Sequence, residues 1–497
     1  MPHASYTRLE EWFRRISALT DAGAILQWDL ATMMPKGGAR GRADQLAVLK
    51  ALRHSLLCSL EVAQLLDAAG ADVSLDDWQR ANLKEMRRAH VLASAVGQPE
   101  VEALSRASSA CEAAWRDARA ESDFSIVRPS LEALVPLVRA TAEARAKALG
   151  LDPYDALLEE YEPGGRAAEI DPIFTRLGEA LPPLLTAVLD RQAEAGPPPE
   201  FRGPFPIEAQ RRLAVQFMER LGFDFHHGRL DVSLHPFCGG TPDDVRITTR
   251  YDEQDFRPAL MGVLHETGHA LYERGLPKEW RGLPVADARG MVLHESQSLL
   301  IEMQVCRSRA FLAFAAPLIR ATFNGSGPAW EAEALYRHYA RVEPGLIRVN
   351  ADEVTYPAHV ILRYRLEKAL LAGTLKVADL PGAWAEGMRD LLGITPPDDR
   401  SGCLQDIHWY DGAFGYFPTY TLGAIAAAQL FDAACRAEPG LTEGIAAGEF
   451  APLITWLRTH VHSQGSSKST REILIAATGR PLDAEAFVAH LERRYLG

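Results

Sequence analysis

The sequence predicts a mainly α-helical protein with one small β element, and three observations lead to this fold class. Long segments rich in Ala, Leu, Glu and Arg carry apolar residues at three- and four-residue spacing, as amphipathic helices require. Gly and Pro cluster between such segments, notably at 195–206 and 395–402. A different pattern, with apolar and polar residues alternating, begins at Gly228.

The helical segments span most of the chain. They are 83–121, 128–149, 165–195, 207–221, 257–274, 288–316, 328–341, 357–373 and 418–435. In the alternating stretch, Leu230, Val232 and Leu234 precede a Gly-Pro-Asp turn region. Val245 and Ile247 follow that region, so the pattern predicts a short antiparallel hairpin.

The overall composition excludes several classes of protein. With 497 residues, 47% hydrophobic and 24% charged, the chain has the balance of a globular protein. Its formal net charge of −13 argues against nucleic-acid binding, which requires a basic surface. Its apolar stretches are too short for a membrane span, and the N-terminus has no apolar signal core. The six cysteines are isolated, which is typical of a reducing compartment, so we expect a cytoplasmic protein.

The stretch MGVLHETGHALYERG contains the pattern His-Glu-x-x-His at His265, Glu266 and His269. Residues four apart lie within about 40° of each other on a helix, so both imidazoles can reach one metal ion. Glu266 lies beside them and can reach a bound water. The two variable positions, Thr267 and Gly268, are uncharged, as a buried metal helix requires.

A third ligand must come from outside this helix. Tyr272 and Gly275 stand where a metzincin would have Gly and His, which excludes that class. A carboxylate from a later segment would complete a two-His, one-Glu site with one open position. The candidates in the following residues are Glu273, Glu279, Asp287, Glu295 and Glu302. We favour Glu295, because an unpaired carboxylate in so apolar a helix would be costly. Glu302, two turns further on, can orient a ligand from behind.

The pairing of HETGH with HESQS, in which Glu295 follows His269 by 26 positions, resembles the carboxypeptidase Taq family of metallocarboxypeptidases. Five further segments agree in order along nearly the whole chain. They are WDLATMMPKGGARGRADQ near the N-terminus, HPF at 235–237, DVRIT at 244–248, IRVNADEVTY at 347–356 and QDIHWYDGAFGYFPTYTLG at 405–423.

The resemblance implies a large helical metallopeptidase fold, with residues 1–497 forming one domain whose two lobes flank a deep groove. It also implies a homodimer that releases single amino acids from the C-termini of peptides. One divalent ion per chain is implied, most often Zn²⁺, although Co²⁺ or Mn²⁺ can occupy the same ligands. The small β element is expected beside the His-Glu-x-x-His helix.

The resemblance also suggests roles for individual residues. Glu266 is the expected general base. Tyr420 is the expected oxyanion stabiliser and His408 a substrate or transition-state contact, with Tyr416 between them in sequence. His235, in HPF, is a further candidate contact or a packing residue.

An exopeptidase of this kind must also bind the terminal carboxylate of its substrate, for which Arg is the natural partner. Arg348 is the first candidate, followed by Arg363 and Arg246, and each can instead form an ordinary ion pair. Asp352 and Glu353 can hold an Arg or Tyr in place, or they can cap a helix.

Two other functions use the same residues. A metallo-oligopeptidase would cut peptides internally and would need no free carboxylate. A non-catalytic peptide- or metal-binding protein would not need Glu266, because a structural zinc site requires no general base.

Overall fold

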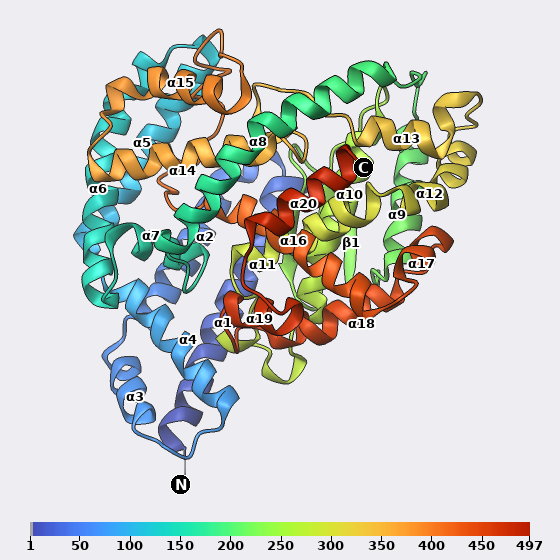
Figure 1. Ribbon diagram of the computed structural model, residues 1–497. Coiled ribbons are helices and arrows are strands. Elements are labelled where there is room, and N and C mark those ends of the chain that lie inside the picture. The colour runs from blue at the N-terminus through green and yellow to red at the C-terminus, as the bar shows by residue number, and fades with distance from the viewer. Residues whose placement is uncertain (1–2) are drawn as a thin grey trace.

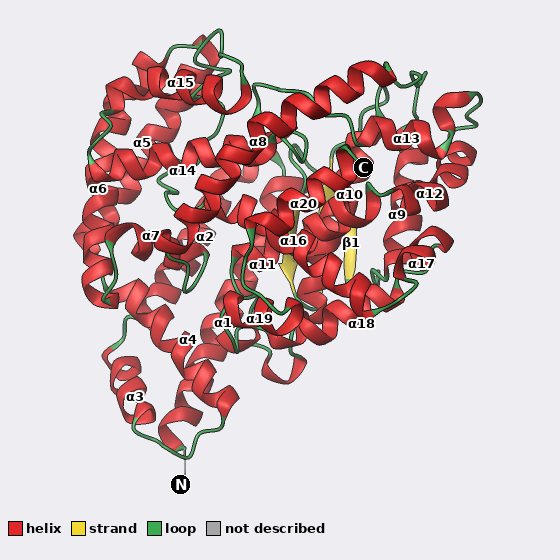
Figure 2. Ribbon diagram, viewed as in Figure 1, coloured by secondary structure: helices red, strands yellow, loops and turns green. Residues whose placement is uncertain are grey.

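Helices make up most of the molecule, and Figure 2 shows a small sheet among them. The computed structural model describes residues 3–497. The sheet has three strands and packs against the helix that carries His265 and His269. The predicted class, mainly α with a minor β element beside this helix, is confirmed.

The first half of the chain contains nine α-helices among the described residues, and α3 to α7 lie on one side of the molecule (Figure 1). The nine helices are α1 (Ala4–Thr32), α2 (Ala39–Leu57), α3 (Leu60–Gly70), α4 (Asp77–Ser94), α5 (Gln98–Glu121), α6 (Phe124–Leu149), α7 (Pro153–Tyr161), α8 (Ala167–Ala195) and α9 (Ile207–Leu221).

The second half places α10, α11 and α16 in the middle of the molecule and α12, α13, α17 and α18 on the side opposite α3 to α7 (Figure 1). The helices are α10 (Phe256–Gly275), α11 (Met291–Leu299), α12 (Arg309–Thr322), α13 (Ala332–Tyr339), α14 (Tyr356–Ala372), α15 (Leu380–Leu392), α16 (Pro418–Ala437), α17 (Leu441–Ala447), α18 (Ala451–His460), α19 (Thr470–Thr478) and α20 (Ala484–Tyr495). A π-helical segment, η4 (Leu300–Cys306), follows α11 directly. Short 3₁₀ turns occupy Lys36–Gly38, Lys278–Trp280, Pro284–Ala286, Pro328–Trp330, Arg348–Asn350, Val377–Asp379 and His462–Gln464.

Two of the predicted helical segments, 83–121 and 288–316, break into separate α-helices. The segment 83–121 breaks into α4 and α5 at Gly97, which precedes the Pro near the start of α5. The segment 288–316 breaks after η4, where the Ser308 side chain accepts a hydrogen bond from the Phe311 N–H and caps α12. In both places a capping residue starts a new helix inside a continuous apolar pattern.

The strands are β1 (Gly228–Val232), β2 (Phe237–Thr241) and β3 (Asp244–Thr249), in the order β1-β3-β2. β3 pairs antiparallel with β2 but parallel with β1, where Leu230 lies opposite Ile247. The predicted antiparallel hairpin therefore named the wrong partner for β3. The strand containing Leu230 and Val232 pairs in parallel, and Leu234 lies beyond it, exposed to solvent. The antiparallel partner, β2, was not predicted because its sequence, FCGGT, has two glycines and no apolar alternation.

Two hydrophobic clusters stabilise the regions around the sheet and the N-terminus. α1, α3 and α4 share a cluster of their own, which includes Leu9, Phe13, Leu66 and Met86. Leu230 and Ile247 from the sheet pack against Val263 and Ala270 of α10 in another cluster. The sheet thus buries one face against the helix that carries the His-Glu-x-x-His motif.

Gly240 provides a test of the β2–β3 hairpin. It has a φ of +89°, and a Cβ built there would lie 2.1 Å from the Asp244 carbonyl oxygen. We expect Gly240→Ala to lower the free energy of unfolding by about 1–3 kcal/mol in urea denaturation. Gly23→Ala, in α1, is the control, because its Cβ would meet nothing within 4 Å. It should leave stability unchanged or raise it by up to about 1 kcal/mol. Equal losses in both variants would contradict the prediction.

Candidate metal centre and active site

Three side chains from two helices meet at the centre of the molecule. His265 and His269 come from α10 and Glu295 from α11, and one ligand atom from each lies within 4.8 Å of the others. The two imidazole rings are 5.1 Å apart and nearly perpendicular. The structure therefore brings together the three predicted metal ligands.

The chemistry of these donors fits a divalent cation. Two imidazole nitrogens and one carboxylate oxygen are a donor set that zinc-type ions prefer. The distance from His269 Nε2 to Glu295 Oε2 is 3.7 Å, too long for a hydrogen bond. Burial raises the pKa of Glu295, although the neighbouring His265 and His294 oppose the shift. A cation between the three donors would compensate this buried negative charge.

Two glycines allow α11 to pack closely between α10 and α16. A Cβ at Gly268, inside the HETGH motif, would lie 2.4 Å from the Gln297 carbonyl oxygen and 2.6 Å from Ser298 Cα. On the other side, a Cβ at Gly423 of α16 would lie 2.8 Å from Glu295 Cβ. The position of the Glu295 carboxylate thus depends on the absence of side chains at both glycines.

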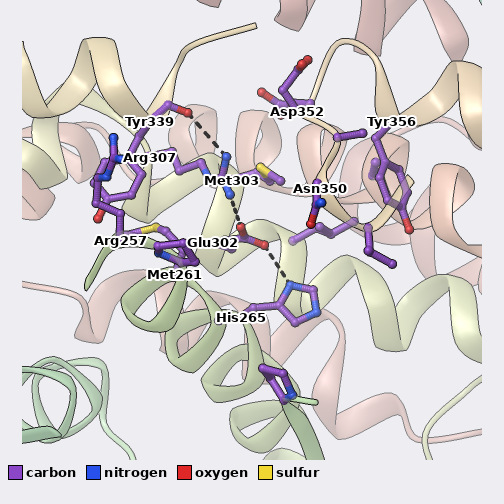
Figure 3. A pocket seen from close by; sticks show the side chains of 18 of the residues that line it. Arg257, Met261, His265, Glu302, Met303, Arg307, Tyr339, Asn350, Asp352 and Tyr356 are labelled. Atoms are coloured by element: carbon purple, nitrogen blue, oxygen red, sulfur yellow. Dashed lines mark hydrogen bonds and ion pairs between the residues drawn. The ribbon is translucent and has the colours of Figure 1, made fainter. Parts of the chain in front are cut away.

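A row of charged groups lies behind His265 (Figure 3). His265 Nδ1 lies 2.9 Å from Glu302 Oε2, and Arg307 donates to the other oxygen of Glu302. Although burial alone would raise it, Arg307 and His265 hold the pKa of Glu302 at about 2. Glu302 lies in the π-helical segment η4, and its contact with His265 agrees with the orienting role expected from its spacing.

The ring of His269 packs against the ring of His294. The two rings stack with centroids 4.4 Å apart, and His294 Nε2 lies 2.9 Å from Glu273 Oε1. Glu273, one of the candidate ligands, therefore pairs with His294 behind the site. Glu295, the neighbour of His294 in α11, faces the two motif histidines.

The site opens into a groove of about 790 Å³, which is lined by α10, α11, η4, α13, the segment 348–357 and α16. Glu266 lines this groove and is only 7% exposed. Burial raises its pKa to about 7, even though the neighbouring His265 opposes the shift. Glu266 is thus a carboxylate beside the three donors that can exchange a proton near neutral pH.

Tyr420, from α16, also lines the groove. Its hydroxyl lies 3.3 Å from His408 Nε2. Burial lowers the pKa of His408 to about 4 and raises that of Tyr420, so both side chains are neutral at pH 7. The Tyr416 ring packs edge-on against Tyr420, with centroids 5.2 Å apart. The structure brings this predicted group together beside the groove.

Of the three candidate arginines, Arg348 is the one that lines the groove within residues 3–497. Its Nε and Nη2 donate to Asp406, its Nη1 donates to the Tyr356 hydroxyl, and its guanidinium lies 4.9 Å from the Tyr420 ring centroid. Arg363 is fully buried behind it, also paired with Asp406. It is therefore not placed to contact a peptide in the groove.

Arg246 and His235 lie near the sheet. Arg246 pairs with Asp244 in β3, and its guanidinium lies 4.5 Å from the centroid of the Trp28 ring of α1. His235 is exposed, and the adjacent Pro236 lines the groove. In the described part of the chain, neither His235 nor Arg246 belongs to the lining of the groove itself.

Sequence reasoning missed Asp406 and Tyr356, the two residues that hold Arg348. Both occur in quoted motifs, QDIHW and IRVNADEVTY. Arg348 and Asp406 are 58 positions apart in the sequence. Acidic residues are so common that the sequence alone cannot identify which of them pairs with a given arginine. With burial opposing the shift, Arg363 and Arg348 hold the pKa of Asp406 well below its usual value, so it stays ionised.

Comparison with known families explains this arrangement. The model for carboxypeptidase Taq (M32) metallopeptidases matches residues 8–495. The chain belongs to this M32 family. The family predicted from the HETGH and HESQS motifs is thereby confirmed, and with it a divalent-metal-dependent carboxypeptidase activity on peptides.

Relatives of this M32 carboxypeptidase match it over nearly their whole length. Thermostable carboxypeptidase 1 of Thermus thermophilus is 42% identical over 509 residues, with 99% of each chain covered. Carboxypeptidase 1 of Bacillus subtilis is 36% identical over 505 residues, covering 99% of this chain and 98% of its own. The solved structure of Trypanosoma cruzi metallocarboxypeptidase 1 has a TM-score of 0.97 at 40% identity, with 99% of both chains covered.

The packing of α11 predicts a matched pair of glycine variants in α10. Gly268→Ala should displace α11 and lower the metal content of purified protein by about tenfold or more. Losses of this size follow when a residue that orients a metal ligand is removed. Gly262→Ala should retain metal, because its Cβ would lie 3.8 Å from the nearest atom, an ordinary contact. Metal content is measured by elemental mass spectrometry. Full occupancy in Gly268→Ala would contradict this account of the site.

Proposed function

We propose that the chain is a zinc carboxypeptidase of the His-Glu-x-x-His type, in which His265, His269 and Glu295 hold one Zn²⁺. The observation that carries this proposal is the approach of their donor atoms to within 4.8 Å at the edge of a groove. Co²⁺ or Mn²⁺ suits the same donors, so the ion present in a cell also depends on supply. When bound, the metal supplies a Lewis acid that brings the pKa of a coordinated water to about 7 and polarises a carbonyl.

Glu266 is the proposed general base. Its carboxylate accepts a proton from the attacking water and later gives that proton to the nitrogen of the leaving amino acid. The raised pKa of Glu266 supports this role, because a base with a pKa near the working pH can accept and release a proton within one catalytic cycle.

Tyr420 and His408 are the proposed transition-state contacts. When neutral His408 donates its Nε2 proton to the Tyr420 oxygen, the Tyr420 hydroxyl proton is free for the carbonyl oxygen of the scissile bond. A donor aimed at developing negative charge stabilises the transition state more than the substrate. Tyr416 would fix the Tyr420 ring from the side and form part of the substrate contact.

Arg348 is the proposed anchor for the substrate's terminal carboxylate. A guanidinium has five N–H donors, and Asp406 and Tyr356 take three of those on Arg348. Two donors remain, enough for a carboxylate. Arg363 would contribute by holding Asp406 rather than by touching the peptide.

The walls of the groove near the sheet are the proposed contact region for the rest of the peptide. Arg246 and His235 are assigned to longer substrates, whose additional residues would reach the sheet beyond Pro236.

We further propose that residues 1–497 act as one domain with two lobes around the groove, that two chains form a homodimer, and that the enzyme is cytoplasmic. The six unpaired cysteines support a reducing compartment. Among residues 3–497, no helix has both the length and the apolar character needed to cross a bilayer.

Glu266→Gln tests the general base. The variant keeps the shape of the side chain but loses its basicity, so kcat should fall by about 10²–10⁴-fold while metal content stays at one ion per chain. Product formation is followed by mass spectrometry on a short peptide, with chelator-treated wild type as the blank. Activity within a few fold of wild type in Glu266→Gln would overturn the proposed mechanism.

Arg348→Gln tests recognition of the carboxylate. Loss of a charge-assisted contact should lower kcat/KM by about tenfold to a hundredfold on peptides with a free C-terminus. Arg341→Gln is the control, because Arg341 lines the same groove but is largely exposed. Stepwise release of C-terminal residues from the free acid, and none from the matching amide, is expected of wild type. An Arg348→Gln enzyme as efficient as the control would remove Arg348 from the substrate site.

A further inference from the structure

Glu353 is a buried carboxylate at the edge of the groove that the mechanism above does not use. It is 5% exposed and lies in the same segment as Arg348. Three groups of the C-terminal helix α20 approach its two oxygens: His490 Nε2 at 2.9 Å, Arg494 Nη1 at 3.0 Å and the Tyr495 hydroxyl at 3.1 Å. Gln304 Nε2 of η4 donates at 3.1 Å. Four partners from two distant parts of the chain therefore converge on one side chain.

The segment around Glu353 has little regular structure of its own. The backbone bonds within residues 347–356 are local, such as Ala351 N to Arg348 O and Tyr356 N to Asp352 O. A segment held by local bonds alone keeps its internal shape but not its position on the protein. Its position must come from side-chain contacts with other elements.

Those contacts approach the segment from two sides. Gln405 and Asp406 bind the backbone N–H and the guanidinium of Arg348, and thus hold the N-terminal part of the segment. Glu353 holds the C-terminal part, through α20 and η4. η4 also contains Glu302, the partner of His265. Glu353 thus links the segment that contains Arg348 to η4, whose Glu302 contacts the proposed metal ligand His265.

The chemistry of the cluster favours a positioning role over a contribution to stability alone. A buried ion pair adds little net stability, because both charges lose their hydration, and apolar packing of equal volume often stabilises a protein as well or better. Such a pair does fix the orientation of the carboxylate side chain, because the carboxylate must face its donors. Arg494 and His490, aided by Tyr495, hold the pKa of Glu353 well below its usual value against the opposing effect of burial, so the charge persists.

We propose that Glu353 is a positioning residue for substrate binding: through His490, Arg494 and Tyr495 it docks the C-terminal helix onto segment 347–356 and sets the place of Arg348. This inference rests on the proposed role of Arg348 as the carboxylate anchor. It assigns a role in substrate binding to the last turns of α20, which in Figure 1 runs across the middle of the molecule close to the C-terminus.

The test measures recognition of the carboxylate directly. In a Glu266→Gln background, where turnover is expected to be about 10²–10⁴-fold slower, the affinities of benzoyl-Gly-Phe and of its C-terminal amide are measured by calorimetry on the metal-loaded protein. The ratio of the two affinities reports the contact made by the terminal carboxylate. Glu353→Gln and Arg494→Met are then added singly, and Arg493→Gln is the matched control, because Arg493 is its exposed neighbour on the same helix.

We expect the parent to bind the acid more tightly than the amide, and Glu353→Gln and Arg494→Met to shrink that ratio by about tenfold. Arg493→Gln should leave the ratio unchanged. Tyr495→Phe removes a single hydroxyl and serves if the larger changes prevent folding; it should shrink the ratio by a few fold. In active enzyme the Glu353 variant should raise KM for the acid with little change in kcat.

Three results would overturn the inference in different ways. If the parent discriminates between acid and amide and the Glu353, Arg494 and Tyr495 variants do so equally well, the segment does not depend on α20. If the parent itself shows no preference for the acid, the assignment of Arg348 fails, and the positioning role of Glu353 fails with it. A fall in thermal stability with an unchanged ratio would show that the cluster is structural only.

Discussion

The close approach of α11 to its two neighbours is the constraint on which the rest of the site depends. Gly268 of α10 and Gly423 of α16 leave just enough room for the backbone of α11 and the start of the Glu295 side chain. This packing places three carboxylates, from Glu266, Glu295 and Glu302, within one buried region. So much buried negative charge is unfavourable unless a cation or a basic group compensates it. Helix packing therefore concentrates negative charge that the proposed metal ion would compensate.

The groove is organised from behind by buried ion pairs, and all but one of them join distant parts of the chain. Asp406 holds Arg348 and Arg363, Glu302 holds Arg307, and Glu353 holds Arg494. Each carboxylate stays ionised because the basic group beside it outweighs the cost of burial. In each case the pair fixes the direction of a side chain or the place of a loop that faces the groove. Specific geometry, rather than large net stability, is what buried pairs of this kind provide.

The sequence was most informative where function depends on spacing within one helix or between two. Residues four apart on α10 must share a face, so the two motif histidines were identifiable, and Glu295 and Glu302 followed from an apolar helix in which carboxylates are costly. It was least informative about pairing between elements. Alternation located β1 and β3 but not the parallel direction of their pairing, and the glycines of β2 concealed a strand.

The sequence by itself determined the helical class and the family, and it predicted the three proposed metal ligands, because each of these is encoded in local pattern and in motifs that keep their order along the chain. Tertiary structure alone decided which arginine reaches the groove. Arg348 and Arg363 share the partner Asp406, and only packing places Arg348 in the lining of the groove and Arg363 behind it. It also decided that the last turns of the chain hold Glu353. Such contacts join residues between 43 and 141 positions apart, and no local periodicity records them.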